Sequence, residues 1–480
     1  MGNGTAREPP RGSRSSDVGY WLPEERKTTD SFKIERQESY QCSCSSEIER
    51  FGSTTTLHGI RYVTTRNFIP FRRIFWFILL ICLSVWLGHG LVAGLNKYLD
   101  YPVSTVVTVS YVESLHFPAV TFCNYNLFKN SKVHPNPNIR TVLAALALND
   151  NTIVDWDQYD KFYENVTWNI TERAILTGHR MEDMLLECKW NTGQVCSAEN
   201  FTTVITDFGV CHTFNSRQDA TTGLLVNQAG ASQGLRIRLS LEQDEYFWGE
   251  FTGAGFKILA HSHGELPLVK QLGFSVAPGF ETSVSLRHVV SKSLPHPYRS
   301  NCFNKRLKYS QNYTSALCRF ECQVDFVVQK CGCRDYRFPG DAKLCDPKQI
   351  IQCVVPATEE FNTHFTKCTC PVPCRQEVFD PKTSIAHWPS EFVVKELATR
   401  NNLTAEFIRK NYLEVRIFFD ELSSEEISQV SSYDGLDLQS DIGAYMGLVC
   451  GASVITIVEF IDCIIVHFCR KISSVQTITK

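Results

Sequence analysis

Two long apolar stretches interrupt a chain that otherwise alternates short apolar and polar runs. The first, residues 74–95, carries no formal charge and is long enough to cross a hydrocarbon core of about 30 Å. The second, residues 441–469, begins at Asp441. Glu459 and Asp462 lie inside its apolar run, where an ionisable side chain is costly and usually faces a partner or water. The pattern predicts two membrane helices, the second of which is more than an anchor.

Basic residues come directly before the first stretch and directly after the second, and so flank the pair of stretches from outside. Arg72 and Arg73 precede the first stretch, and Arg470 and Lys471 follow the second. The positive-inside rule then places both termini in the cytosol. The predicted parts are a cytosolic N-terminal region (1–57), a juxtamembrane segment (58–73), a helix (74–95), an extracellular domain (96–440), a second helix (441–469) and a cytosolic tail (470–480).

Cysteine usage supports this topology. Of 20 cysteines, 14 lie between the two apolar stretches, and ten of these fall within residues 302–374. An even, clustered set in an extracellular segment is typical of a disulfide framework, although spacing alone leaves the pairing open. Because residues 302–374 have few apolar positions, we expect disulfides rather than a separate core to hold them. Five glycosylation sequons also fit an extracellular segment: Asn165, Asn169, Asn200, Asn312 and Asn402.

Within the extracellular segment the apolar spacing changes several times. Runs rich in Val, Thr and Tyr predict strands, and apolar positions three or four apart predict helices. The resulting fold class is a disulfide-rich, mixed α+β extracellular domain between two transmembrane helices. The expected order is a strand region at 101–122, helices within 138–190, short strands over 203–290, the cysteine cluster at 302–374, a helix at 390–411 and a strand at 412–419.

The remaining chemistry argues against catalysis and cofactors. The net charge of −3 gives no sign of a nucleic-acid partner, and no P-loop, HExxH, GxSxG or dinucleotide fingerprint occurs. Only His261 and His263 lie close together, and without an evident third ligand we interpret them as part of a polar strand face. We therefore predict neither an enzyme nor a bound metal or cofactor; sodium would be a permeant ion.

The second apolar stretch shows a one-sided pattern if it is a continuous helix. At 100° per residue its two ends bring carboxylates onto one stripe, which in a symmetric oligomer would form acidic rings that concentrate cations. The alternative is an anchor with interfacial acidic residues, which Glu459 and Asp462 fit poorly. The stripe consists of Asp441, Tyr445, Leu448, Ala452, Ile455, Glu459 and Asp462.

Two short motifs are weak by themselves. The triplet Gly451-Ala452-Ser453 either permits close helix packing or lets the helix open, so that backbone carbonyls line a narrow point. His58-Gly59 precedes the first stretch, where a polar juxtamembrane loop is the default interpretation.

Taken together, the motifs resemble the degenerin/epithelial sodium channel superfamily, and most closely its acid-sensing ion channel branch. The resemblance covers about residues 55–470. It rests on His58-Gly59, FPAVTFCN at 117–124, CSAENFTTVITDFGVCHTFNS at 196–216, QLGFSVAPGFET at 271–282, the cysteine cluster, and SDIGAYMGLVCGAS at 440–453 followed by Glu459.

The resemblance implies a trimer around a sodium-preferring, often amiloride-blocked pore, with Gly451, Ala452 and Ser453 as its selectivity filter. It implies that His58 and Gly59 form a re-entrant loop at the cytosolic pore mouth and that Ser440 occupies the degenerin position. Tyr101 and Tyr298 would couple the extracellular domain to the membrane, and Leu422-Ser423 would lie on the linker associated with desensitisation. The implied disulfides are Cys123–Cys211, Cys188–Cys196, Cys302–Cys374, Cys318–Cys370, Cys322–Cys368, Cys331–Cys353 and Cys333–Cys345.

Departures from the family concern the stimulus. Pro102-Val103 replaces a histidine pair found in acid-sensing members, and the finger is shortened to WGEFTGAGF at 248–256. Proton gating needs crowded carboxylates or histidines with a pKa near neutrality. Glu425 and Glu426 remain candidates, although two such carboxylates are more often a solvated turn. We therefore hypothesise that strong acid activation is absent or weakened.

The sequence thus predicts a sodium-selective plasma-membrane channel, homotrimeric or assembled with related subunits, that an extracellular ligand or proton opens. Two alternatives remain: a ligand-binding or adhesion receptor without conduction, and a modulatory subunit that is silent without a partner subunit.

Overall fold

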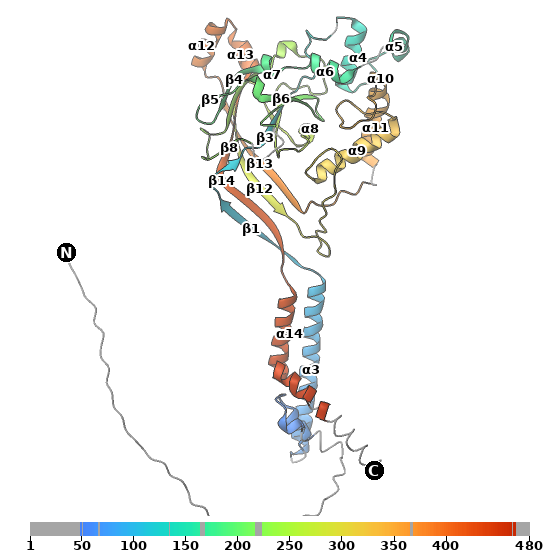
Figure 1. Cartoon of the computed structure of the whole chain (residues 1–480), viewed down its shortest axis with the longest axis vertical. Helices are drawn as coiled ribbons and strands as arrows, with labels where there is room; N and C mark the ends of the chain where they lie inside the picture. Colours follow the sequence, from blue (N-terminus) through green and yellow to red (C-terminus); the bar gives the residue numbers. More distant parts are fainter. Residues whose placement is uncertain are drawn as a thin grey trace, which may run out of the picture. The chain divides into compact units, whose positions relative to one another are not determined.

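The computed structural model describes residues 49, 51–65, 68–133, 135–163, 169–216, 223–364, 368–462 and 464–466. It consists of two compact units, one formed by Met1–Ser84 with Met446–Lys480 and the other by Val85–Tyr445. Figure 1 labels the helices and strands. The predicted tail at 470–480, Asn165 and most of the N-terminal region lie outside the described residues.

The first apolar stretch is a single helix, α3 (Pro70–Leu99), of 30 residues and mean hydropathy 2.1. It is longer at both ends than the predicted helix at 74–95. Its length and apolar composition suffice to cross a membrane. The short helix α2 (Ile60–Thr64) precedes it. The expected second helix is not continuous. Helix α14 (Gly435–Cys450) ends just before the triplet Gly451-Ala452-Ser453, and a further helix, Val454–Val466, follows at an angle of 69°.

Two sheets organise the larger unit (Figure 1). The seven-stranded sheet has the order β13-β12-β14-β9-β4-β5, with β1 paired to β14, and the five-stranded sheet has the order β11-β10-β3-β7-β6. A short pair, β2 and β8, stands apart. The bounds are β1 Val103–Tyr111, β2 Leu115–His116, β3 Ala119–Asn124, β4 Leu185–Trp190, β5 Gln194–Val195, β6 Phe201–Ile205, β7 Val210–Phe214, β8 Leu225–Val226, β9 Leu235–Ser240, β10 Phe256–His261, β11 Phe274–Val276, β12 Phe280–Lys292, β13 Arg375–His387 and β14 Tyr412–Ser431.

The main hydrophobic core draws buried side chains from both sheets, including Phe122 and Phe256 from one and Ile237 and Val415 from the other. Alternating apolar positions in β9 and in the first half of β14 produce this packing, because successive side chains of a strand point to opposite faces. The second half of β14 is polar, and it still forms a strand because it pairs with β1 and β12.

Most helices of the larger unit are short, and α9, α10 and α11 lie within the cysteine-rich segment. Their bounds are α4 Pro137–Leu148, α5 Trp156–Tyr163, α6 Ile170–Thr177, α7 Met181–Met184, α8 Val269–Leu272, α9 Ser315–Cys331, α10 Pro347–Gln349, α11 Val355–His364, α12 Glu391–Asn401 and α13 Ala405–Asn411. The 3-10 turns η1 (Ala198–Asn200) and η3 (Gln243–Glu245) and the π-helical turn η4 (Ile350–Val354) complete the order.

The cysteine-rich segment shares a hydrophobic core with other parts of the chain, so disulfides alone do not hold it, although we had expected them to. Phe320, Val324 and Val327 of α9 are buried together with Leu143 and Leu146 of α4. The segment borrows apolar partners from a helix some 170 residues earlier, and a count of its own apolar positions cannot reveal that. Its disulfides therefore reinforce a packed core.

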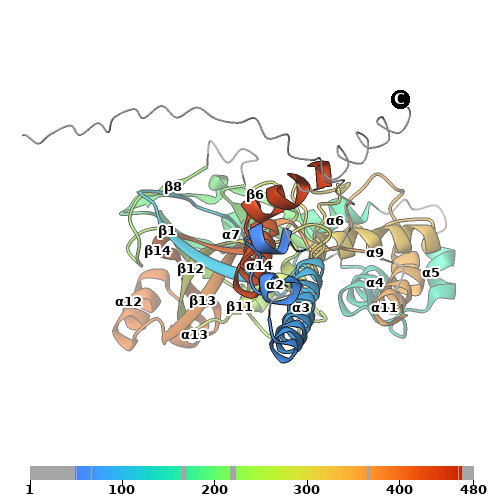
Figure 2. The ribbon, with the colours of Figure 1, turned by 90° about the horizontal axis from the view of Figure 1, so that it is seen from below.

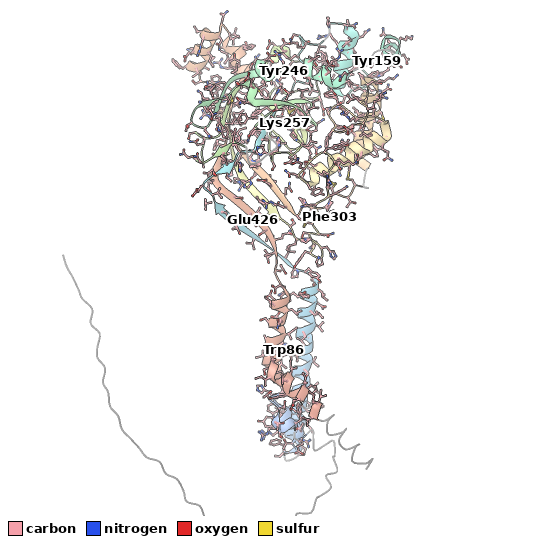
Figure 3. The ribbon with its side chains drawn as sticks, viewed as in Figure 1. Trp86, Tyr159, Tyr246, Lys257, Phe303 and Glu426 are labelled. Atoms are coloured by element: carbon pink, nitrogen blue, oxygen red, sulfur yellow. A yellow bond between two sulfur atoms is a disulfide. The ribbon has the colours of Figure 1, made fainter. Side chains whose placement is uncertain are left out.

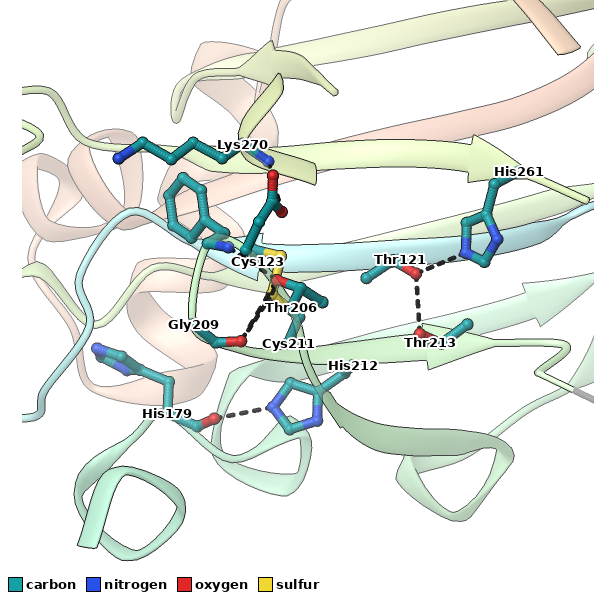
Figure 4. Close-up of a disulfide and its surroundings, with 12 residues drawn as sticks. Thr121, Cys123, His179, Thr206, Gly209, Cys211, His212, Thr213, His261 and Lys270 are labelled. Atoms are coloured by element: carbon teal, nitrogen blue, oxygen red, sulfur yellow. Dashed lines mark hydrogen bonds between the residues drawn. A yellow bond between two sulfur atoms is a disulfide. The ribbon is translucent and has the colours of Figure 1, made fainter. Parts of the chain in front are cut away.

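Seven disulfides join the pairs that the family resemblance implies: Cys123–Cys211, Cys188–Cys196, Cys302–Cys374, Cys318–Cys370, Cys322–Cys368, Cys331–Cys353 and Cys333–Cys345. Figure 4 shows the first of these pairs between β3 and β7.

One local expectation is wrong. Within the predicted helical region, α7 ends at Met184, and residues 185–190 form β4 instead, because they pair with β9 along the main core.

His261 lies on strand β10 with polar neighbours, as predicted, and the structure adds that it is buried. It is 8% exposed, and its Nε2 shares a hydrogen bond of 2.9 Å with Thr121 Oγ1 (Figure 4). Burial lowers the pKa of His261 to about 4, so this histidine is neutral.

Candidate functional site

The candidate site is the bend between α14 and the helix Val454–Val466. Gly451 adopts a left-handed conformation with φ of 61°, which glycine reaches without the steric penalty of a side chain. The amide of Gly451 donates to Gly447 O at 3.0 Å, and that of Ala452 donates to Met446 O at 3.3 Å, as at a helix C-terminus. The Ser453 amide then donates to Thr456 Oγ1 at 3.1 Å, which caps the next helix.

His58 lies directly against this bend. Its amide donates to Cys450 O at 2.9 Å, so it satisfies a carbonyl that the end of α14 leaves unpaired. A Cβ atom added to Gly451 would lie 2.3 Å from His58 Nδ1. The His-Gly and Gly-Ala-Ser motifs, almost 400 residues apart in the sequence, therefore form one site.

Two threonines that sequence reasoning missed complete the site. Thr56 Oγ1 shares a hydrogen bond of 2.7 Å with Thr456 Oγ1, which belongs to a residue only 5% exposed. The amide and hydroxyl of Thr56 also donate to Glu459 Oε2, at 3.2 and 3.1 Å. Glu459 thus binds the segment that carries His58. No local pattern marks either threonine, because each contact joins residues about 400 positions apart.

The His58 segment is also fixed to the first part of α3. Gly59, with φ of 83°, begins α2, and a side chain there would meet Leu80 at 3.1 Å. Tyr62 stacks on Trp76 with ring centroids 4.6 Å apart. Figure 2 shows α2 beside α3, in agreement with these contacts. The segment thus packs against the first half of α3, and a re-entrant loop at a pore mouth stays a prediction.

The stripe predicted for the second helix is wrong as a single line, because the bend changes the register after Cys450. Its first members also differ in surroundings. Tyr445 packs on α3, where a Cβ at Gly90 would lie 2.8 Å from its ring. Asp441 accepts a hydrogen bond of 2.7 Å from Tyr433, whose ring lies 4.3 Å from the Lys97 ammonium. The exposed members are Leu448, Ile455 and Asp462, and Ala452 is half-buried; Ser440, next to the stripe, is also exposed.

Comparison with known proteins identifies the family. Residues 51–463 match the family model described as amiloride-sensitive sodium channel. The chain belongs to this family. Acid-sensing ion channel 2 of Mus musculus is 34% identical over 445 residues, which cover 87% of this chain and 86% of that protein. Acid-sensing ion channel 1C of Danio rerio is 32% identical over 456 residues, covering 90% and 85%.

Acid-sensing ion channel 1 of Gallus gallus is 34% identical over 439 residues, covering 86% of this chain and 83% of that one. Among solved structures, a proton-activated chloride channel covers 82% of this chain and 96% of its own with a TM-score of 0.33 and 5% identity, which is too low to carry an argument. Membership of the sodium channel family makes the chain an ion-channel protein and not an enzyme.

The residues expected to couple gating lie in the larger unit. The rings of Tyr101 and Tyr298 are in edge contact, with centroids 5.6 Å apart. Leu422 and Ser423 lie within β14, where Leu422 O accepts a hydrogen bond of 2.9 Å from the Val112 amide beside β1. The predicted coupling residues therefore lie at contacts between chain segments.

Glu425 and Glu426 are strand residues of β14 and not a solvated turn. Glu426 forms an ion pair of 2.7 Å with Lys292, and Glu425 lies 3.7 Å from Arg287.

Two other carboxyl groups have the perturbed acidity that the sequence could not reveal. Burial raises the pKa of Asp207 to about 6, although the amide of Lys270 donates to it at 3.1 Å. Burial likewise raises the pKa of Glu265 to about 7. Neither residue lies in a charged run; the cause is the fold around them, which removes water from the carboxyl group.

The four sequon asparagines among the described residues are all exposed, as an attached glycan requires: Asn169, Asn200, Asn312 and Asn402. Two of them also hold a helix end. Asn169 caps α6 by accepting from the Glu172 amide at 3.2 Å, and Asn402 ends α12 in a left-handed conformation. Their modification stays a prediction.

Proposed function

We propose that this chain is a subunit of a trimeric, sodium-selective, amiloride-sensitive cation channel in the plasma membrane. In this proposal both termini are cytosolic, and the extracellular domain opens the pore in response to a ligand or a proton. The subunits are identical or belong to related chains. The observation that carries the proposal is the bend at residues 451–453, with His58 packed against it, in a chain that belongs to the sodium channel family.

The bend provides groups that can bind a cation. An intact helix uses its carbonyl oxygens internally, whereas a break leaves some of them free. Among the described residues, Cys450 O accepts from His58, but the carbonyls of Gly451 and Ala452 accept no hydrogen bond. Three copies of this bend around an axis would form a ring of free oxygens, and such rings can replace the water around an ion.

The extracellular domain offers a direct path to the membrane-proximal contacts. Strand β14 runs from the core at Tyr412 to Ser431. Every residue of β1 pairs with the second part of β14, residues 423–431. A shift of β14 would therefore move β1 and, beyond Pro102, the contact of Tyr101 with Tyr298. A ligand or proton acts only as far as its affinity differs between the closed and open arrangements.

We expect activation by acid to be weak or absent, because Pro102-Val103 replaces the histidine pair of acid-sensing relatives. Glu265 and Asp207 still titrate near neutrality and would support a modest dependence on pH. The test is a step to acidic pH in oocytes that express the chain alone. A large transient inward current would contradict this expectation.

Conduction is tested at Ser453. Ser453→Val should lower the preference for sodium over potassium, measured from reversal potentials of amiloride-sensitive current. Val454→Leu, next in the chain and 78% exposed, is the matched control and should leave the ratio unchanged. Equal ratios for wild type and Ser453→Val would remove Ser453 from the filter.

A non-conducting receptor is distinguished at Ser440. Ser440→Cys treated with a bulky thiol reagent should increase amiloride-sensitive current if Ser440 occupies the degenerin position. A receptor would give no such current before or after treatment. If current appears only when a related subunit is co-expressed, the chain is a partner subunit and not a homotrimeric channel.

A further inference from the structure

A cavity of about 430 Å³ lies in the larger unit, away from the pore residues. Three segments form it: the loop after β10, the loop from residue 303 to the start of α9, and the first residues of β13. Figure 3 labels Phe303 at the start of the second loop. The lining residues that matter here are Ser262, Glu265, Lys305, Arg306, Arg375 and Glu377.

The cavity carries three cations without a close ion pair. Lys305, Arg306 and Arg375 are exposed, and none of them has a carboxylate within 4.0 Å among the described residues, although Arg375 acts electrostatically on Glu377 from a greater distance. Nearby basic residues differ: Lys308 lies 2.5 Å from Asp325, and Lys292 lies 2.7 Å from Glu426. Three positive groups gathered at one cavity and left unpaired favour a negatively charged occupant, since guanidinium groups bind carboxylates through paired hydrogen bonds.

The two acidic residues of the lining cancel only part of this charge. Glu377 is already engaged, because its Oε1 accepts a hydrogen bond of 2.5 Å from His288 Nε2. Glu265 carries a proton for much of the time at neutral pH, since burial raises its pKa to about 7. The positive groups exceed the negative ones by one, or by two when Glu265 is protonated. A protonated Glu265 can also donate a hydrogen bond to a carboxylate.

The wall contains unused hydrogen-bonding groups. Ser262 Oγ is buried and has no partner among the described residues, and the same is true of Nε2 of the adjacent His263. Buried polar atoms in folded proteins nearly always have a partner, so each such atom calls for a reason. A cavity that receives a polar ligand gives one for Ser262, because Ser262 is among the lining residues.

We propose that this cavity is a regulatory binding site for a small organic molecule bearing one or two carboxylates. The carboxylates bind Lys305, Arg306 and Arg375, and the Ser262 and Glu265 side chains supply further donors. The site itself stands on the cavity, whereas its effect on current rests on the proposed channel function.

The cavity connects to the gating strand through two hydrogen bonds. Glu377 binds His288 Nε2, and His288 Nδ1 lies 3.0 Å from Ser424 Oγ. Ser424 follows Leu422-Ser423 directly in β14. An occupant that draws Arg375 toward the cavity changes the electrostatic field at Glu377, two residues further along β13. A change at Glu377 would then alter the position of Ser424, because His288 binds both residues. His288 is thus a positioning residue that does not itself contact the ligand.

Binding is tested on the purified full-length protein in detergent, with adipate as the probe and its uncharged diamide as the control ligand. Adipate should raise the melting temperature in a saturable manner, and the diamide should not. Arg375→Gln should weaken adipate binding about tenfold, the usual loss for one charge-assisted hydrogen bond. Arg400→Gln, an exposed arginine on α12 without an ion pair among the described residues, is the matched control and should change the affinity less than about twofold.

The site is refuted if adipate and its diamide act alike, or if the two arginine variants bind adipate equally well. The measurement is repeated in Asn312→Gln, because a glycan at Asn312 would lie at the same cavity. A saturable shift only in that variant means that the glycan occupies the site in the natural protein, and this outcome overturns the proposal as well.

Coupling is tested by current. Adipate should change amiloride-sensitive current in wild type, and His288→Ala should abolish this change while adipate affinity stays within about twofold. His288→Gln, which keeps one hydrogen-bond donor and one acceptor, should restore part of the effect. Loss of affinity equal to the loss of effect would refute the positioning role. Binding without any amiloride-sensitive current, with or without related subunits, would refute the proposed function and leave the binding site standing.

Discussion

Adding one methyl group at the bend should disturb the candidate filter more than any other substitution of similar size. In Gly451→Ala the new Cβ would lie 2.3 Å from His58 Nδ1, 2.4 Å from Cε1 and 2.7 Å from Cγ. Real Cβ atoms do not approach other heavy atoms so closely, so the imidazole must move. The backbone at Gly451 is also left-handed, with φ of 61°, which an alanine adopts only at a cost.

The two costs can be separated. The left-handed conformation costs an alanine about 1–2 kcal/mol whatever its neighbours, and the overpacked contact adds about 1–3 kcal/mol. In His58→Ala the ring is gone, so Gly451→Ala in that background should keep only the first cost. The double-mutant cycle therefore predicts a coupling of about 1–3 kcal/mol between His58 and Gly451, within the range found for residues in contact.

Melting temperatures of the four purified proteins give the cycle, and reversal potentials give the effect on ion selectivity. Gly451→Ala should lower the melting temperature by several degrees, at roughly 1–2 °C per kcal/mol when the values for smaller domains are scaled to this length. Gly447→Ala is the matched control, since an added Cβ at Gly447 meets no atom within 4 Å. The reasoning fails if both alanine variants behave alike, or if the His58 and Gly451 effects simply add.

Three further predictions follow from the larger unit. In the folded protein the pKa of Glu265 is raised from 4.5 to about 7, so the folded state loses up to about 3 kcal/mol of stability as the pH rises through this range. Glu265→Gln should therefore make the melting temperature depend less on pH between pH 5 and 8. Glu414 is 0% exposed and lies 2.7 Å from both Arg236 and Arg238. Glu414→Gln should therefore lower the free energy of unfolding by about 3–5 kcal/mol and reduce the amount of protein at the cell surface. Glu406→Gln, in the exposed pair with Lys410, is the control and should change neither quantity. Removing Cys302–Cys374, with a sequence separation of 72, should destabilise the protein by about 4.5 kcal/mol, against about 2.5 kcal/mol for Cys188–Cys196 with a separation of 8, as read from denaturant unfolding.

The features that the sequence predicts well are those written in local patterns or shared motifs. Residues 74–95 are apolar throughout, and α3 contains all of them. The seven disulfides follow the pairs implied by the family resemblance, although spacing alone left the pairing open. The strand at 412–419 exists as the first part of β14.

The features that the sequence misses depend on partners far away in the chain. Residues 420–431 are too polar to predict a strand, and they form one because β1 and β12 pair with them. The last residues of the helical region predicted within 138–190 form β4 for the same reason, since they pair with β9. The helical stripe from Asp441 to Asp462 assumes an unbroken helix, which a left-handed glycine ends at Cys450. In each case tertiary pairing or a single backbone angle overrides the local pattern.

The acidity of individual groups shows the same limit more sharply. Glu425 and Glu426 remain candidates as proton sensors from the sequence, although a solvated turn is the commoner interpretation; in the structure each lies beside a basic side chain, Arg287 or Lys292. Glu265 and Asp207 stand alone in the sequence, yet burial raises the pKa of both toward neutrality. Crowding of charge is visible in a sequence, whereas removal of water from one carboxyl group is a property of the fold. A response to pH in this channel would therefore arise from isolated, buried carboxyl groups and would survive substitution of Glu425 and Glu426 together by glutamine.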